Sequence, residues 1–314
     1  MQNNKKVLVT GAAGFIGLNV VKEYVQAGFS VIALVHNNVP DELKNLNNVQ
    51  LIKGDVTNEE FIKGLNLDVD IIAHVAGLAS DIGSDETFKK INFDPVKYLS
   101  QIPKNKFIYV SSSDVYGIKD FCNADENTCL CEFPKNPYPH YKIKSENWLR
   151  ENCPVNYVFI RPAAVWGEGD KTLENRVAEF LRTSPFIIHF GKWKGKNRWP
   201  LANVKNVAKT IVSVSETNDF DNEAITIIDP EKITIEEYYR NIANKYFPDK
   251  KFKTLTLPFW CGKLLGAFST FVSNCLHKKH PVFDPTFYAV HHVSSNLDFS
   301  SKKMEKVLER VQTK

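Results

Sequence analysis

The chain has 314 residues, of which 43% are hydrophobic and 24% are charged, and its formal net charge is +4. This composition is typical of a globular protein with one large domain and a smaller one. The charge is mild and no Lys/Arg block is interleaved with aromatic residues, so a nucleic-acid partner is not expected. Six cysteines and an N-terminus without an apolar leader favour a cytoplasmic protein with reduced thiols.

The first motif is the stretch KKVLVTGAAGFIG at residues 5–17. Residues 7–10 favour a strand, three spaced glycines follow, and an amphipathic stretch comes next. A strand that turns into a helix on spaced glycines presents free N–H groups and the positive end of the helix dipole to a phosphate. We therefore predict a dinucleotide site formed by Gly11, Ala13, Gly14, Phe15, Ile16 and Gly17.

Up to about residue 161, β-rich and helical runs alternate along the chain. This alternation predicts an α/β protein with a Rossmann-like, doubly wound parallel sheet. Strands are expected at 30–35, 49–52, 70–76, 106–112 and 155–161, and helices at 86–101 and 138–152.

The alternation loosens after Pro162. Strands are expected at 186–190 and 224–228, and helices at 204–216 and 234–246. We expect residues 1–165 to form the dinucleotide-binding domain, with 200–230 returning to it. Residues 166–314 would form a smaller, discontinuous C-terminal substrate-binding region.

Residues 255–276 are the most apolar stretch of the chain. The stretch is long enough to cross a bilayer, but Pro258, two glycines and Lys263 argue against a span. We interpret it as an apolar lid, a helix packed over a substrate cavity. Monotopic contact with a membrane surface is the alternative.

Three cysteines, Cys122, Cys129 and Cys131, lie in one predicted loop. Their C-x6-C-x-C spacing matches no common zinc pattern, and no histidine lies within the loop to complete a ligand set. No metal site is therefore expected.

The residues best suited to chemistry follow the fifth predicted strand. Ser112 lies at the end of that strand, and Tyr138 and Lys142 share one face of a later helix. An ammonium near a phenol, with a nicotinamide ribose between them, lowers the pKa of the tyrosine. The tyrosine can then act as a general acid/base while the serine orients the substrate oxygen. Tyr141 begins Y-x-x-x-S instead of Y-x-x-x-K, and we interpret it as a bystander.

Taken together, these motifs resemble the extended short-chain dehydrogenase/reductase family, also called the NAD-dependent epimerase/dehydratase family. The resemblance implies a Rossmann fold, catalytic residues Ser112, Tyr138 and Lys142, and contact of the last two with the cofactor. It covers roughly residues 5–250 and rests on TGAAGFIG (10–17), GDV (54–56), HVAG (74–77), VSSSDVYG (110–117), YPHYKIKSE (138–146) and RPAAVWGEGD (161–170).

Several further positions are candidates for cofactor contact. Asp55 could accept a hydrogen bond from the adenine amine, or it could cap the helix that starts near Asn58. His74 is more easily explained as a packed strand residue than as a catalyst. Asn92 matches a family asparagine that helps to hold the active site, and a capping or packing role is the alternative. Small or apolar residues where the backbone passes close to the cofactor complete the set: Val56, Val75, Ala76 and Gly77.

The residues after the second strand bear on the choice between NAD and NADP. An acidic residue there binds the ribose 2′-hydroxyl of NAD, whereas its absence tolerates the 2′-phosphate of NADP. This chain has His36 followed by Asn37 and Asn38. NADP is therefore favoured over NAD.

The preferred function is an NAD(P)-dependent oxidoreductase that interconverts a secondary alcohol and a ketone on a hydrophobic or sugar-like small molecule. Residues 195–206 depart from the nucleotide-sugar pattern of the family, while 255–276 and the aromatic segment 283–288 look more like hydroxysteroid-dehydrogenase-like relatives. One alternative is a nucleotide-sugar epimerase or dehydratase with retained NAD. Ser113 and Asp114 stand where family dehydratases carry an acidic pair or Ser followed by Glu. A third hypothesis is a non-catalytic NAD(P)-sensing protein. A homodimer is possible from the sequence alone.

Overall fold

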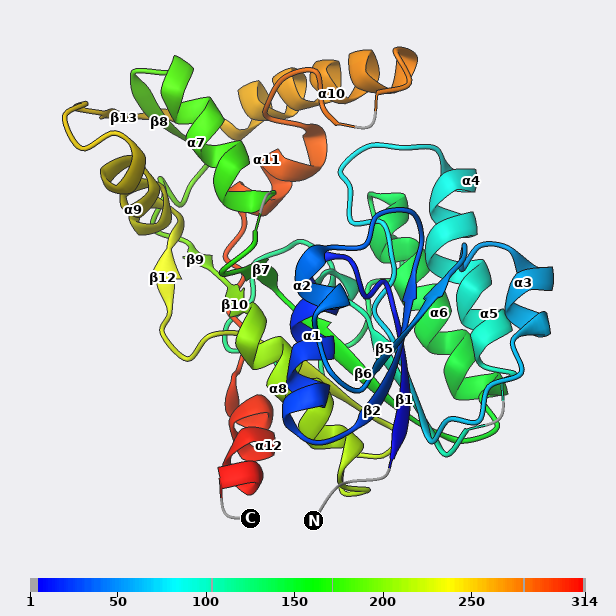
Figure 1. The fold of residues 1–314 in the computed structure, drawn as a ribbon. Helices are drawn as coiled ribbons and strands as arrows, with labels where there is room; N and C mark the ends of the chain where they lie inside the picture. The colour runs from blue at the N-terminus through cyan, green and yellow to red at the C-terminus, as the bar shows by residue number, and fades with distance from the viewer. Residues whose placement is uncertain (1–4, 103, 171, 279, 313–314) are drawn as a thin grey trace.

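The computed structural model describes residues 5–312, apart from 103, 171 and 279. Within these residues, seven parallel strands form the central sheet in the order β11-β6-β5-β4-β1-β2-β3 (Figure 1). The chain starts in the middle of the sheet and winds outward in both directions, which is the predicted doubly wound fold. The strands are β1 (Lys6–Thr10), β2 (Ser30–Val35), β3 (Val49–Lys53), β4 (Ile71–His74), β5 (Lys106–Val110), β6 (Asn156–Pro162) and β11 (Glu223–Ile227).

Helices cover both faces of this sheet. Alternate residues of β1 point to opposite faces, so Val7 and Val9 belong to one core cluster and Leu8 to the other. The first cluster is closed by α1 (Phe15–Gln26), α2 (Asp41–Lys44), α8 (Val204–Ser215) and α12 (Lys302–Gln312). The second is closed by α3 (Glu59–Gly64), α5 (Asp94–Leu99) and α6 (Pro137–Asn152).

The helix predicted at 86–101 is divided into three pieces. A turn of π-helix, η1 (Lys89–Phe93), separates α4 (Asp85–Phe88) from α5. Pro95 lies in the first turn of α5 and has no N–H to donate to a preceding carbonyl. The regular α-helical hydrogen-bond ladder is therefore interrupted here, and the wider turn accommodates the change.

The remaining elements form a smaller lobe, which lies above the sheet in Figure 1. Trp199, Ile187, Leu181, Ile235 and Ile242 belong to its apolar cluster. Three short strand pairs build the lobe: β7 (Ala164–Trp166) with β10 (Leu201–Asn203), β8 (Phe186–Phe190) with β13 (Lys253–Leu257), and β9 (Arg198–Trp199) with β12 (Ile233–Thr234). Its helices are α7 (Leu173–Thr183), α9 (Ile235–Tyr246), α10 (Phe259–Cys275) and α11 (Phe287–Ser294).

The apolar stretch 255–276 begins in β13 and continues as α10. The residues that α10 buries are small: Gly262, Gly266, Ser269 and Ser273. Its large apolar side chains point outward, which differs from the expected packing over a cavity, because the small residues are the ones that allow close contact with α11. None of the helices in the described part of the chain combines the length and apolarity needed to cross a bilayer.

Candidate active site

The glycine turn between β1 and α1 has the shape that a dinucleotide needs. Gly11 has φ +66°, and a Cβ there would lie 2.8 Å from the backbone of Ala76. A Cβ at Gly17 would lie 2.0 Å from the Gly11 carbonyl oxygen, so only glycine lets α1 pack this closely. Gly14 is the N-cap of α1 and leaves the first N–H groups of the helix facing the turn. The predicted residues of this turn therefore fit a pyrophosphate.

The other residues near the turn that are predicted to contact the cofactor also pack against the hydrophobic core. The side chains of Ala13, Ile16 and Val75 are partly buried against the first core cluster, and Val56 is partly buried against the second. Phe15 opens α1. Their contact with a cofactor stays a prediction.

His74 supports the backbone beside the glycine turn. Its Nδ1 lies 2.7 Å from Thr10 Oγ1, and that hydroxyl accepts a hydrogen bond from Ala76 N–H. Burial, with a smaller effect of Lys142, lowers the pKa of His74 to about 3. A neutral, fully buried imidazole fits the expected structural role.

Asn92 acts on the same loop from the π-helical turn. Its Oδ1 accepts from Leu78 N–H at 2.7 Å, and its Nδ2 donates to the Leu78 carbonyl at 2.9 Å. A Cβ at Gly77 would lie 3.1 Å from Asn92 Oδ1 and 3.3 Å from Lys142 Nζ. Asn92 thus fixes the backbone next to Gly77 and does not cap a helix.

His36 and Asp55 face each other at the ends of β2 and β3. His36 Nε2 lies 3.8 Å from Asp55 Oδ2, and both side chains are exposed. Asp55 accepts from Thr57 N–H at 2.8 Å, while Asn58 caps α3. Partial burial is outweighed by the Thr57 hydrogen bonds and by His36, so the pKa of Asp55 is lowered. Asp55 is therefore not the helix cap, and its contact with an adenosine stays a prediction.

Ser112, Tyr138 and Lys142 come together at the end of β5. Ser112 accepts from Asp114 N–H at the start of the 3₁₀ turn η2 (Ser113–Tyr116) and is hydrogen-bonded to Tyr138. Asn136 caps α6 by accepting a hydrogen bond from Tyr138 N–H. This cap fixes the first turn of the helix, in which Tyr138 lies. Lys142 Nζ donates to the Val110 carbonyl at 2.8 Å and lies 5.9 Å from the centre of the Tyr138 ring.

The electrostatics of this group differ from the expectation that Lys142 lowers the pKa of Tyr138. Burial and the Asp114 carboxylate raise the pKa of Tyr138, and the Ser112 hydrogen bond only partly opposes them. Burial lowers the pKa of Lys142 to about 7, against the attraction of Glu146. Desolvation and the Asp114 carboxylate dominate the pKa of Tyr138, so the buried tyrosine is held as a neutral phenol, a proton donor.

A buried ion pair supports these residues from behind. Arg161 on β6 donates to both carboxylate oxygens of Glu146 on α6, at 2.9 and 2.6 Å. Ser111 also donates to Glu146, and Arg161 donates to the Tyr116 hydroxyl. Glu146 lies one turn from Lys142, so the pair fixes α6 against the ends of β5 and β6.

A second group beside Tyr138 comes from the other lobe. Tyr288 on α11 donates to Asp114 Oδ2 at 2.6 Å, and His292 Nε2 lies 3.4 Å from the same oxygen. Despite burial, His292 and Tyr288 lower the pKa of Asp114, and Asp114 raises the pKa of His292. Sequence reasoning missed Tyr288 and His292. The aromatic character of 283–288 pointed toward Tyr288, and no sequence signal pointed toward His292.

Tyr141 points away from this group. Its hydroxyl donates to Asp85 at 2.6 Å, and its ring packs near Phe93. It lies three residues after Tyr138 on α6 and makes contacts outside the Ser112 group, as expected of a bystander.

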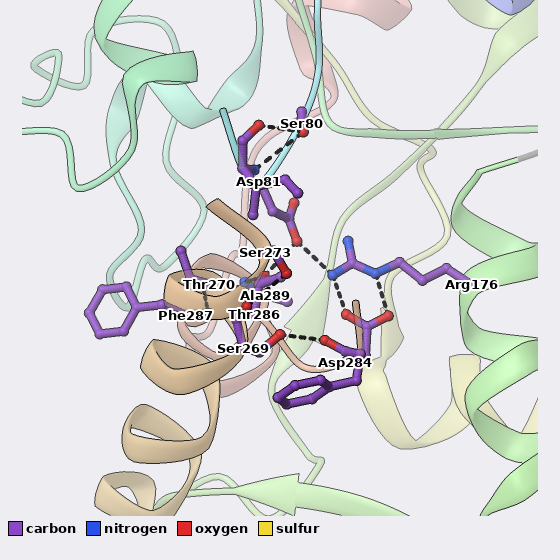
Figure 2. A network of polar contacts seen from close by, with 12 residues as sticks. Ser80, Asp81, Arg176, Ser269, Thr270, Ser273, Asp284, Thr286, Phe287 and Ala289 are labelled. Carbon is purple, nitrogen blue, oxygen red and sulfur yellow. Dashed lines mark hydrogen bonds and ion pairs between the residues drawn. The ribbon is translucent and has the colours of Figure 1, made fainter. Parts of the chain in front are cut away.

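A polar clasp joins the two lobes and consists of Asp81, Arg176, Asp284 and Thr286 (Figure 2). Arg176 on α7 forms a two-point ion pair with Asp284 and reaches Asp81 at 2.6 Å. Thr286 Oγ1 also donates to Asp81 at 2.6 Å. The clasp therefore holds the loop after β4 against α7 and the start of α11.

Comparison with known proteins identifies this arrangement. The sequence profile of the 3-beta hydroxysteroid dehydrogenase/isomerase family matches residues 8–261. The chain belongs to this family, which confirms the predicted extended short-chain dehydrogenase/reductase type and its enzymatic class.

Two curated relatives and one solved structure illustrate the likeness. A 3-beta-hydroxysteroid dehydrogenase of Mycolicibacterium neoaurum is 29% identical over 189 residues, which are 55% of this chain and 51% of that protein, so the match spans about half of that relative. A decarboxylating sterol-4-alpha-carboxylate 3-dehydrogenase of Candida albicans is 24% identical over 90% of this chain and 86% of that protein. The structure of a UDP-glucuronic acid 4-epimerase from Bacillus cereus in complex with NAD has a TM-score of 0.66 at 18% identity, covering 96% of this chain and 99% of that one.

Proposed function

We propose that this protein is an NAD(P)-dependent oxidoreductase that interconverts a secondary alcohol and a ketone on a hydrophobic small molecule. One observation carries the proposal: the Ser112 hydroxyl after β5 interacts with the Tyr138 phenol on α6, and Lys142 Nζ lies 5.9 Å from the centre of the tyrosine ring. The glycine turn and the close approach of Gly77 to Lys142 fit a nicotinamide dinucleotide. When bound, that cofactor supplies or accepts the hydride.

Each residue of the group has a defined role. Tyr138, held as a phenol, donates its proton to the carbonyl oxygen during reduction and takes it back in oxidation. Ser112 orients the same oxygen by hydrogen bonding. Lys142, anchored on the Val110 carbonyl, would hold the ribose of the cofactor, and its ammonium would stabilise the phenolate that remains on Tyr138 after the proton has moved to the substrate oxygen.

The hydrophobic substrate class rests on the smaller lobe and on the relatives. Aromatic side chains of α11 approach the site, and Tyr288 bonds to Asp114 within it. The curated relatives are named for steroid and sterol substrates. We therefore propose a 3-hydroxy or 3-keto steroid-like ring compound as the substrate class.

A panel of 3-ketosteroids, other hydrophobic ketones and nucleotide-sugars tests this proposal. We expect NAD(P)H oxidation, followed by nicotinamide absorbance, with the hydrophobic ketones. Turnover of nucleotide-sugars alone, with tightly retained NAD in the purified protein, would establish the epimerase or dehydratase alternative. The buried Asp114 beside Tyr138 is the observation that favours that alternative, because a dehydratase needs a second acid/base.

For the cofactor we propose a preference for NADP over NAD. His36 stands where a carboxylate would select NAD, and it faces Asp55 at 3.8 Å. His36→Asp should reverse the preference by ~1–3 kcal/mol, the scale of one charge-assisted hydrogen bond. Titration of NADPH and NADH against both proteins measures this, with His280→Asp as an exposed control. Tenfold tighter binding of NADH by the unmodified protein would reject the preference.

A further inference from the structure

Helix α10 carries its largest apolar side chains on an uncovered face. Trp260, Leu264, Phe268 and Phe271 are 63%, 64%, 60% and 66% exposed. Their spacing of four, four and three residues places them along one side of the helix, and we call this surface the α10 stripe. Large contiguous apolar patches of this kind mark interaction surfaces.

The opposite side of α10 prevents the helix from turning the stripe inward. A Cβ at Gly262 would lie 2.7 Å from the Phe190 ring, and one at Gly266 would lie 2.8 Å from the Phe287 backbone. Gly262 and Gly266 follow Trp260 and Leu264 by two residues, or about 200° around the helix. Only the small side fits against α11, so the stripe stays on the outside.

The charges in the sequence segment that contains the stripe are of one sign. Residues 250–283 contain no Asp or Glu, although the whole chain has 36. On the helix itself Lys263 is exposed, and His277 and Lys278 are exposed just beyond its end. The basic residues of the segment are Lys250, Lys251, Lys253, Lys263, His277, Lys278, Lys279 and His280. This combination of apolar and cationic groups complements an anionic lipid surface.

We propose that α10 docks on the surface of an anionic lipid bilayer. The helix lies parallel to the bilayer, with the stripe in the boundary between headgroups and acyl chains and the lysines among the headgroups. The buried side of α10 packs on α11, on β8 and on the segment before α11, so we expect the helix to lie on the bilayer and not to enter it end-on.

The docked helix packs against α11, the helix that carries Tyr288 of the active-site group. A hollow of about 580 Å³ is lined by Phe271 and Thr270 of α10 and by Phe287 of α11. The residue after Phe287 is Tyr288, whose hydroxyl bonds to Asp114 beside Tyr138. A hydrophobic ketone dissolved in the bilayer would enter by this side. This second step rests on the proposed function, whereas docking itself does not.

Vesicle co-sedimentation of the whole chain tests the docking. We expect the protein to pellet with vesicles of equimolar phosphatidylcholine and phosphatidylglycerol, and less with phosphatidylcholine alone. Phe268→Glu/Phe271→Glu should weaken the partitioning at least about tenfold, because two acidic groups replace the apolar contact. Leu264→Glu should weaken it as well, while Leu51→Glu, an exposed leucine on β3, should not. Lys263→Gln should reduce binding to the anionic vesicles only.

Three outcomes overturn the proposal. The first is that the unmodified protein stays in the supernatant with both vesicle types. The second is that Phe268→Glu/Phe271→Glu pellets as fully as the unmodified protein while its thermal midpoint is unchanged. The third is that light scattering shows a dimer that this variant converts to a monomer, since a second copy would then cover the stripe. Vesicle binding without turnover of any ketone would reject the proposed function and leave docking in place.

Discussion

The sheet domain and the smaller lobe are each held near the site by ion pairs, and these pairs differ in their exposure to solvent. In the sheet domain, Glu146 and Arg161 are 0% and 2% exposed and hold α6 against β6. In the smaller lobe, Arg176 of the clasp is 34% exposed, and its partners Asp81 and Asp284 are 16% and 27% exposed. A dry pair fixes position strongly when both partners are present, whereas a wetter pair is weaker and easier to separate. The Ser112 and Tyr138 hydroxyls thus lie on the part held by the dry pair, whereas α7 and α11 are held to the sheet domain by the wetter one.

The largest expected effect concerns the part held by the dry pair. Tyr138→Phe removes the proposed proton donor and should lower kcat by roughly 10²–10⁴ with cofactor affinity nearly unchanged. Tyr141→Phe, on the same helix but bonded to Asp85, should cost far less. Single-turnover hydride transfer compares the two. Full activity in Tyr138→Phe together with loss in Tyr141→Phe would show that the site is built on the other tyrosine.

Breaking the buried pair should destabilise the fold. Glu146→Ala leaves Arg161 buried without its carboxylate and should cost ~3–5 kcal/mol in the free energy of unfolding. The expected loss of turnover follows from movement of Lys142, one turn away. Denaturant titration measures the stability, and Glu179→Ala, at an exposed ion pair on α7, is the control. Equal stability of both variants would contradict the contrast drawn between the two lobes.

Breaking the clasp should act mainly on the substrate. Arg176→Met removes the ion pairs to Asp81 and Asp284, and we expect ~1–2 kcal/mol of destabilisation, reduced by the partial exposure of the arginine. The KM for a hydrophobic ketone should rise more than kcat falls, because α11 loses its attachment. Arg182→Met on the same helix provides the matched control. A change in cofactor affinity with an unchanged KM would count against this assignment of the clasp.

The smallest expected effect is a pH dependence at the contact between the lobes. Asp114 raises the pKa of His292, so the stabilisation is present below the ordinary histidine pKa and is lost as the pH rises through the folded-state value. Asp81 adds to the attraction and Arg176 opposes it. Thermal midpoints of the unmodified protein should therefore fall on the alkaline side of neutrality, and His292→Gln should flatten that part of the profile. An identical dependence of the thermal midpoint on pH in both proteins would show that His292 does not cause it.

The sheet domain was predictable because its signals are local. Residues 7–10 and 30–35 carry strand-forming side chains between turn residues, and they form β1 and β2 as expected. The group of Ser112, Tyr138 and Lys142 also follows from spacing along one chain segment. The π-helical turn was missed because its cause, Pro95, acts through a missing hydrogen bond and not through apolar periodicity.

The smaller lobe was less predictable because its contacts are distant in the chain. Asp114 meets Tyr288 and His292 across more than 170 residues, and no spacing rule connects them. In α10 the sequence showed an apolar helix, but not which side would be buried. Gly262 and Gly266 determine the buried side, because they allow a closer approach to the neighbouring elements than larger residues would.

The position of β11 has a consequence for how the protein can be cut. This strand is formed by residues 223–227, after the chain has already built part of the smaller lobe, and among the described strands it pairs only with β6. A fragment ending at residue 165 would leave the outer backbone groups of β6 without that pairing. Such a fragment would be prone to associate through this open edge, so the nucleotide-binding half should not be expected to behave as a separable module.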